Sequence, residues 1–202
     1  MRKFTLAAAA LALVFGATTY STIADAYTVR PDGTLKMRED GIIKVPAYFG
    51  RGSGKSPIRR TEVSYDGGHR PGTIIIDTNE RRLYYVMSDG KAMKYGIGVG
   101  RPGFQWSGTH RVTRKAEWPG WTPPPAMRKR QPGLPRYMPG GPNNPLGARA
   151  MYIGSTIYRI HGSNEPWTIG QAVSSGCIRL ANEDVIDLYK RVKVGDRVVV
   201  KR

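Results

Sequence analysis

Residues 150–180 of the chain read AMYIGSTIYRIHGSNEPWTIGQAVSSGCIRL. Two runs rich in β-branched and aromatic residues, Ala150–Ile153 and Ile157–Ile160, are separated by the turn residues Gly154 and Ser155. This pattern predicts a β-hairpin that leads directly into His161. We therefore expect His161 at the end of a rigid strand, where catalytic groups commonly lie.

The same stretch contains Cys177, the only cysteine of the chain. A thiol attacks a carbonyl carbon as the thiolate, and a nearby imidazole such as that of His161 usually removes its proton. Gly176 allows a tight turn that directs backbone N–H groups toward a developing oxyanion. Cys177 also has two simpler interpretations, an inert buried thiol or an intermolecular disulfide, because a single cysteine cannot form an internal one.

The residues around the cysteine alternate in a way that predicts their faces. If the backbone is extended, Ser175, Cys177 and Arg179 share one face while Ile178 points into the core. Arg179 would then bind a substrate carboxylate and favour the thiolate. The alternative is a structural salt bridge, for example with Asp184.

The order and spacing of the two reactive residues narrow the class of enzyme. His161 precedes Cys177, which excludes a papain-like arrangement, and the short gap between them excludes a caspase-like one. One cysteine and one nearby histidine are too few ligands for a zinc site. A Cys–His acyl-transfer pair of another family remains.

The rest of the chain predicts one mainly β domain. A helix with Asn182 as its N-cap is expected from the apolar stripe that follows it. The segment 117–147 is rich in proline and tryptophan, and we expect it to form a lid over a cleft, with a surface excursion packed on its own tryptophans as the alternative. The predicted strands are Thr73–Asp77, Arg82–Met87, Ala92–Val99, Thr109–Lys115 and Arg197–Lys201.

The N-terminal part predicts export. Residues 1–26 combine two basic residues, an apolar run too short to cross a bilayer and small residues before Ala26, which is typical of a cleaved signal peptide. Residues 27–70 are basic and rich in turn residues, and predict an extended arm or linker with a possible short strand at 42–45. The domain is expected to cover residues 71–202.

The formal net charge of +17 indicates that the protein is attracted to polyanions. Outside the cytoplasmic membrane the abundant polyanions are phosphate-bearing lipids and carboxylate-bearing wall polymers, and a strongly basic protein is attracted to both. Binding to DNA is the weaker alternative, because export is predicted and the chain contains no recognised nucleic-acid motif.

The motifs of the central stretch resemble those of a known family. His161-Gly162-Ser163-Asn164, followed by residues 174–180, SSGCIRL, is similar to the signature of the L,D-transpeptidases, the YkuD family, especially its ErfK/YbiS-like branch. The similarity runs from about Gly72 to the C-terminus and includes the elements at Trp121–Pro124 and Asn144–Gly147.

The resemblance implies a β-sandwich of mixed sheets with a short helix and an enzyme of peptidoglycan biosynthesis, cell wall biogenesis and cell shape in the periplasm. Such enzymes need no cofactor or metal and are targets of carbapenems. Cys177 would be acylated by the diamino acid of a tetrapeptide stem with loss of D-Ala, and the acyl group would pass to an amine to form a 3-3 cross-link.

The resemblance also assigns roles to individual residues. His161 would be the base, with its ring held by the backbone carbonyl of Gly162. The amides of Ser175, Gly176 and Cys177 would form the oxyanion hole.

Three further residues are assigned to substrate binding with Arg179: Trp167, which matches a position lining the cleft in some members, Ser163 and Asn164. The chain departs from many members at Ser175, where they have a second histidine. That histidine is not the general base, so the serine would weaken extra activation of the thiol without excluding activity.

Several uses of the site remain open from the sequence. The same acyl-enzyme could attach an outer-membrane protein, exchange a D-amino acid or be hydrolysed, as in an L,D-carboxypeptidase. A different class is a non-catalytic basic protein that binds the wall. The intact Cys177 and His161 count against this class, because a degenerate site has no chemical reason to keep a lone thiol in an oxidising compartment.

Overall fold

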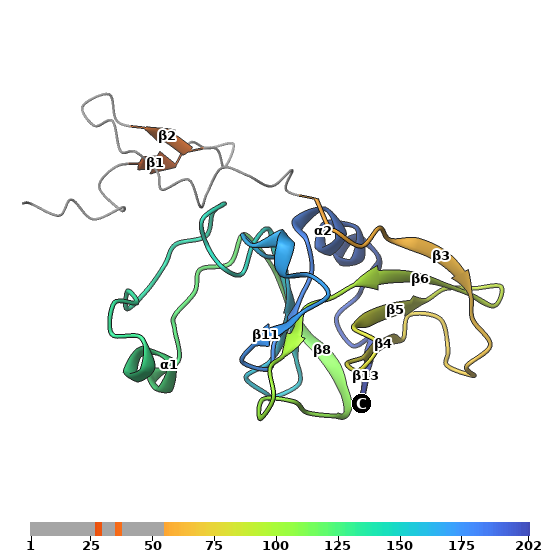
Figure 1. Ribbon diagram of the computed structural model, residues 1–202. Coiled ribbons are helices and arrows are strands. Elements are labelled where there is room, and N and C mark those ends of the chain that lie inside the picture. Colours follow the sequence, from red (N-terminus) through yellow and green to blue (C-terminus); the bar gives the residue numbers. More distant parts are fainter. Residues whose placement is uncertain (1–26, 30–34, 38–54) are drawn as a thin grey trace, which may run out of the picture. The chain divides into compact units, whose positions relative to one another are not determined.

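The computed structural model describes residues 27–29, 35–37 and 55–202 (Figure 1). The predicted signal peptide and the possible strand at 42–45 lie outside the described residues. The chain divides into two compact units, Met1–Val45 and Pro46–Arg202. In the first unit, strand β1 (Tyr27–Val29) pairs antiparallel with strand β2 (Leu35–Met37).

The second unit is built on a mixed sheet with the strand order β12-β10-β9-β8-β13-β4-β5-β6-β3. The pairs β13–β4 and β10–β12 are parallel, and the other neighbours are antiparallel. Strands β7 and β11 form a separate parallel pair. The bounds of the strands are β3 Thr61–Ser64, β4 Ile74–Asp77, β5 Arg82–Val86, β6 Lys91–Gly96, β7 Val99–Gly100, β8 Gly108–Glu117, β9 Arg149–Ile153, β10 Arg159–His161, β11 Ala172–Ser174, β12 Ile178–Arg179 and β13 Arg197–Lys201.

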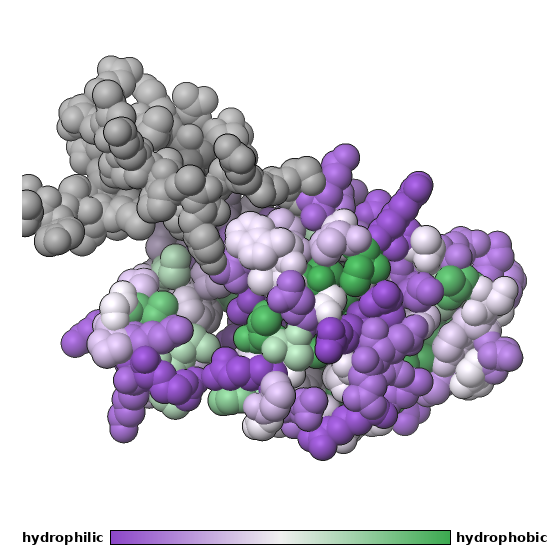
Figure 2. Space-filling view, in the orientation of Figure 1, coloured by the Kyte–Doolittle hydropathy of each residue, from purple (hydrophilic) through white to green (hydrophobic). Residues whose placement is uncertain are grey.

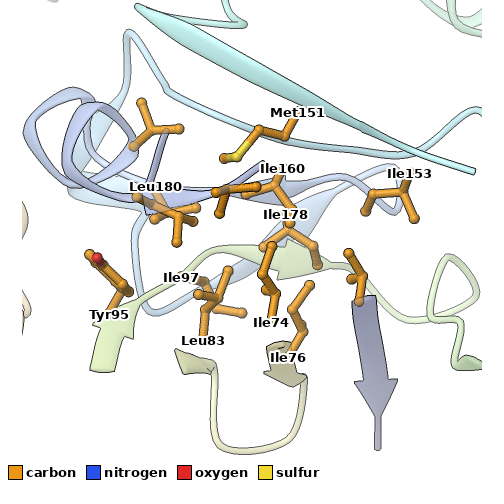
Figure 3. Packing of buried hydrophobic residues seen from close by; sticks show 14 of the residues in the cluster. Ile74, Ile76, Leu83, Tyr95, Ile97, Met151, Ile153, Ile160, Ile178 and Leu180 are labelled. Atoms are coloured by element: carbon orange, nitrogen blue, oxygen red, sulfur yellow. The ribbon is translucent and has the colours of Figure 1, made fainter. Parts of the chain in front are cut away.

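The sheet curls so that its two halves enclose one hydrophobic core. In Figure 3, Ile160 and Ile178 from one end of the sheet face Ile74 and Ile76 from its middle. All four side chains are at most 1% exposed. Burying an aliphatic side chain of this size contributes about 1.5–3 kcal/mol, so these contacts hold the two ends of the sheet together. The predicted mainly β fold with mixed strands and a short helix is confirmed.

Helix α2 (Asn182–Arg191) packs on this core through Val185 and Leu188, both fully buried. The helix is where the pattern placed it, but the predicted N-cap is wrong. Ala181 occupies the cap position, and no side chain caps the helix. The side chain of Asn182 turns away instead, and its Oδ1 accepts the N–H of Ala148 at 2.9 Å.

The segment 117–147 contains regular structure that its prolines did not predict. It runs out to the left of the sheet in Figure 1 and contains the short helix α1 (Pro125–Arg130). Trp121 and Met138 exchange two backbone hydrogen bonds of 2.8 Å, which close the excursion on itself. Tyr137 lies against Gly120 of the same segment, where an added Cβ would be 2.2 Å from its hydroxyl oxygen, although 60% of the tyrosine is exposed.

The domain extends further toward the N-terminus than residue 71. Strand β3 forms the edge of the sheet by pairing with β6. The side chain of Ile58 fills the space beside Gly96, where a Cβ atom would lie 2.6 Å from the Cβ of Ile58. Arg60 forms a 3.0 Å ion pair with Asp184 of helix α2. The last part of the predicted arm therefore belongs to the folded domain.

Hydrophilic residues predominate on the visible face of the described domain (Figure 2). Within the described residues, no helix has the length and apolar character needed to span a bilayer.

We predict that Arg60→Ala lowers the free energy of unfolding by about 1–3 kcal/mol, because it leaves the buried Asp184 carboxylate without its cation. The side chain of Asp184 is only 2% exposed, and burial already raises the pKa of this carboxyl despite the opposing effect of Arg60. Urea unfolding at neutral pH measures the effect. Arg59→Ala, an exposed neighbour, is the matched control and should be neutral; equal stability of both variants would show that the pair does not anchor residues 56–64.

Candidate active site

The parallel pairing of β10 and β12 brings the reactive residues together. Ile160 lies opposite Ile178, and His161 lies opposite Arg179. Because both isoleucines point into the core, the alternation of the strands places Arg159 and His161 on the other face, together with Arg179. The predicted core orientation of Ile178 is confirmed.

His161 is buried at this edge, with 4% of its surface exposed. Its Nδ1 lies 2.6 Å from the carbonyl oxygen of Gly162. A carbonyl can only accept a hydrogen bond, so Nδ1 carries the proton and Nε2 of the neutral ring is unprotonated. The contact with Gly162 is the one implied by the family resemblance.

Burial is the main cause that lowers the pKa of His161, to about 3, and the positive charges of Arg179 and Arg159 lower it further. The backbone carbonyls of Gly162 and Leu146 oppose this shift. His161 is therefore a neutral imidazole at physiological pH, ready to accept a proton but a weak base in the free protein.

Cys177 immediately precedes β12 and is partly exposed. Burial raises the pKa of its thiol above the ordinary value, while the nearby Arg159 and the charge of Arg179 act to lower it. The expected support of the thiolate by Arg179 is thus present but smaller than the effect of burial. The free site holds a neutral thiol and a neutral imidazole.

The turn before the cysteine is fixed by Ser174. Its hydroxyl accepts the N–H of Gly176 at 3.1 Å and donates to the carbonyl of Cys177 at 2.6 Å. The N–H of Gly176, one of the predicted oxyanion donors, is thus bonded to Ser174 in the free protein, and its role toward an oxyanion stays a prediction. Gly176 has a φ of 104°, in the region that favours glycine, and a Cβ there would meet the ring of Tyr158 at 2.4 Å.

The sequence did not reveal Trp106, which supports the turn from the other side. Its indole N–H donates to the carbonyl of Gly176 at 2.7 Å. Its ring stacks on Tyr158, with ring centroids 4.5 Å apart and an interplanar angle of 6°. Trp106 lies far from Gly176 in the sequence, and no local pattern marks a contact over that separation.

The two arginines of the site have different partners. Arg179 does form a salt bridge within the protein, but its partner is Glu165 at 3.3 Å, and the suggested partner Asp184 pairs with Arg60 instead. Arg159 was missed, although its position two residues before His161 on one strand was a signal that both side chains share a face. Its guanidinium lies 5.3 Å from the centroid of the Tyr152 ring.

The other predicted substrate-binding residues lie on the loop after His161. Ser163 is 2% exposed, and its hydroxyl accepts the N–H of Glu165 at 2.9 Å, so it shapes the loop, and its role in substrate binding stays a prediction. Asn164 donates to the carbonyl of Asn143 at 3.2 Å and joins this loop to the proline-rich segment. Trp167, in the short 3-10 helix η3 (Pro166–Thr168), is 42% exposed.

The loop that carries Gly162 is also held from helix α2. Added Cβ atoms at Gly147 and Gly162 would each lie 2.3 Å from Oδ1 of Asn182. Both glycines thus allow the amide of Asn182 to sit between two backbone segments, where it accepts the N–H of Ala148. The carbonyl that orients His161 is positioned by this packing.

Comparison with known proteins now identifies the family. Residues 71–200 match the family described as YkuD, the L,D-transpeptidase catalytic domain, and this match covers more than half of the chain. The chain belongs to the L,D-transpeptidase (YkuD) family.

Among relatives, the probable L,D-transpeptidase ErfK/SrfK of Escherichia coli strain K12 is 43% identical over 136 residues, covering 63% of this chain and 43% of that protein. The probable L,D-transpeptidase YbiS of the same strain is 42% identical over 134 residues, covering 62% of this chain and 43% of that protein. The chain thus matches less than half the length of these two relatives. Its similarity to both supports the ErfK/YbiS-like branch.

Among solved structures, a crystal structure of an L,D-transpeptidase variant from Enterococcus faecium superposes with a TM-score of 0.50 at 21% identity, covering 65% of this chain and 50% of that chain. At this identity the likeness shows the fold alone.

We predict that the pH midpoint of Cys177 alkylation by iodoacetamide is higher in the folded protein than in the unfolded chain, because only the thiolate reacts and burial raises the pKa of the thiol. Stopped alkylation followed by mass spectrometry measures this rate from pH 5 to 11. The urea-unfolded chain is the control and should show a lower midpoint, near the ordinary thiol value. A plateau that begins below pH 7 in the folded protein would instead indicate a preformed thiolate–imidazolium pair.

Proposed function

We propose that the protein is a peptidoglycan L,D-transpeptidase in which Cys177 takes the acyl group of a tetrapeptide stem and transfers it to an amine. The acyl group comes from the diamino acid at the third position, with loss of D-Ala, and the product is a 3-3 cross-link. One observation carries the proposal. His161 is neutral with Nε2 unprotonated, and it lies on the same face of the sheet as Arg159 and Arg179, the two arginines beside Cys177.

In the acylation step, sulfur of Cys177 adds to the carbonyl carbon as its proton passes to Nε2 of His161. The oxyanion that forms is stabilised by the backbone amides of Ser175 and Cys177. The intermediate then collapses: the C–N bond breaks, and the imidazolium gives its proton to the leaving amine of D-Ala. The products are a thioester and free D-Ala.

In the second step, an acceptor amine attacks the thioester as His161 takes a proton from it. The C–S bond breaks, the amide bond forms, and the proton returns to the thiol of Cys177. One histidine thus serves both half-reactions, first as base toward sulfur and then as base toward the amine.

The pKa shifts determine when the proton moves. Burial lowers the pKa of His161 to about 3 and raises that of Cys177, so an ion pair is unfavourable in the free protein. The imidazolium becomes favourable only when the oxyanion develops beside it, because opposite charges attract strongly in a site with little water. Ser175, in place of a second histidine, leaves His161 as the nearby imidazole that performs this transfer.

We further propose that the protein acts outside the cytoplasmic membrane, in the periplasm or cell wall. The support is the signal-like sequence of residues 1–26. The net charge of +17 and the hydrophilic surface in Figure 2 suit a polyanionic wall. Peptidoglycan stem peptides are the partners of the site, with an outer-membrane protein as a further possible acceptor.

The direct test incubates the purified protein with a tetrapeptide donor and measures released D-Ala and the mass of the protein. We predict an acyl-enzyme and stoichiometric D-Ala, both abolished in Cys177→Ala. His161→Gln should slow acylation by about 10²- to 10⁴-fold, the usual contribution of a general base. His69→Gln is the matched control, since His69 is exposed and bonds to Tyr65 and Gly67.

Products formed with an added acceptor peptide distinguish the fates of the thioester. A cross-linked dimer supports transpeptidation, whereas shortened peptide without dimer would replace it with hydrolysis. Acylation that persists in Cys177→Ala would contradict the proposed nucleophile.

A further inference from the structure

Arg159 lies beside the thiol but has no role in the chemistry described above. It begins strand β10, two residues before His161 and on the same face. In the parallel register of β10 and β12, Ile160 pairs with Ile178, so Arg159 lies beside Cys177, and its charge acts to lower the pKa of the thiol. A group at this position can reach the substrate close to the bond that breaks.

The hydrogen bonding of this arginine is incomplete. The Nε atoms of Arg159 and Arg179 are both buried and lack a hydrogen-bond partner within the described part of the chain. Leaving a buried donor unpaired is costly, and more so on a charged group, so such atoms in a native site call for an explanation. A bound anion would provide one.

The two arginines differ in how much of their charge is already neutralised. Arg179 has the carboxylate of Glu165 at 3.3 Å. For Arg159, no carboxylate lies within ion-pair distance among residues 55–202, and its guanidinium faces the ring of Tyr152. Arg114 lies against the same ring, with its guanidinium carbon 3.6 Å from the centroid. The surroundings of Arg159 are therefore cationic and aromatic.

We propose that Arg159 binds the carboxylate of the residue that leaves the donor peptide, and so selects donors in which the scissile bond is followed by a free C-terminal carboxylate. The inference rests on the proposed function. In such a donor a single carbon separates the carboxylate from the scissile nitrogen, so the long side chain of an arginine beside Cys177 is within reach of it. The planar guanidinium suits a carboxylate because it can donate two parallel hydrogen bonds.

Binding of this carboxylate also changes the proton transfer. The charge of Arg159 contributes to the low pKa of His161, so neutralising that charge makes His161 a better base. The same neutralisation weakens the support that Arg159 gives to the thiolate of Cys177. The bound substrate therefore favours transfer of the thiol proton from Cys177 to His161 during the attack on the carbonyl. It disfavours a thiolate–imidazolium pair formed beforehand.

The test compares two donor tetrapeptides that differ only at the C-terminus, one with a free carboxylate and one with an amide. Acylation rates are measured by intact mass for the wild-type protein, Arg159→Gln, Arg159→Lys and the control Arg114→Gln. We expect the wild type to prefer the carboxylate peptide by about 10- to 100-fold, as charge-assisted hydrogen bonds allow. Arg159→Gln should lose this preference because it slows acylation by the carboxylate peptide more than acylation by the amide peptide, and Arg159→Lys should restore part of the preference.

Arg114→Gln should keep the wild-type preference, because it removes a cation from the same tyrosine ring without touching the thiol. If Arg159→Gln slowed acylation by both peptides equally, the inference would be overturned. Arg159 would then act on the thiol of Cys177 and not on the substrate carboxylate. Equal acylation of both peptides by the wild type would also overturn it, with the transpeptidase proposal intact. Failure of the wild type to react with either peptide would instead refute the proposed function and this inference with it.

Discussion

The site depends on the short parallel contact between β10 and β12. Only Ile160 and His161 pair with Ile178 and Arg179, yet this register determines which residues meet on the outer face. The contact is anchored by the two isoleucines, which are buried in the core that closes the curled sheet. A one-residue slip would turn His161 into the core and an isoleucine toward the substrate.

A second constraint follows from the burial of the reactive pair. The surrounding protein disfavours charge on both Cys177 and His161, although two arginines lie close by. The protein thus holds the pair neutral until a substrate supplies the developing negative charge. A neutral thiol is also less reactive toward oxidants than a thiolate.

Much of this arrangement follows from local sequence patterns. The strand at Arg197–Lys201 has the predicted bounds, and the hairpin before His161 and the inward direction of Ile178 follow from alternation alone. Alternation would also have found Arg159. Patterns of this kind succeed because they depend only on the two-residue period of a strand.

The features that sequence patterns did not predict are contacts between side chains and backbone groups set by the tertiary fold. Asparagine is a residue type that favours the N-cap, but the side-chain oxygen of Asn182 accepts the N–H of Ala148, which is distant in the sequence. The motif does not indicate the role of Ser174, whose hydroxyl accepts the N–H of Gly176. Trp106, in the loop between β7 and β8, donates its indole N–H to the carbonyl of Gly176 in the turn before Cys177. These partners are set by the tertiary fold, which no local propensity encodes.

The central claim is that Cys177 is the acyl-accepting nucleophile. Incubation of the protein with a carbapenem, followed by intact mass and peptide mapping, tests it most directly, because the ring-opened antibiotic remains bound as an ester of the sulfur. The account predicts a single adduct that maps to Cys177 and is lost in Cys177→Ala. An unmodified wild-type protein, or an adduct that persists in the variant, would contradict it.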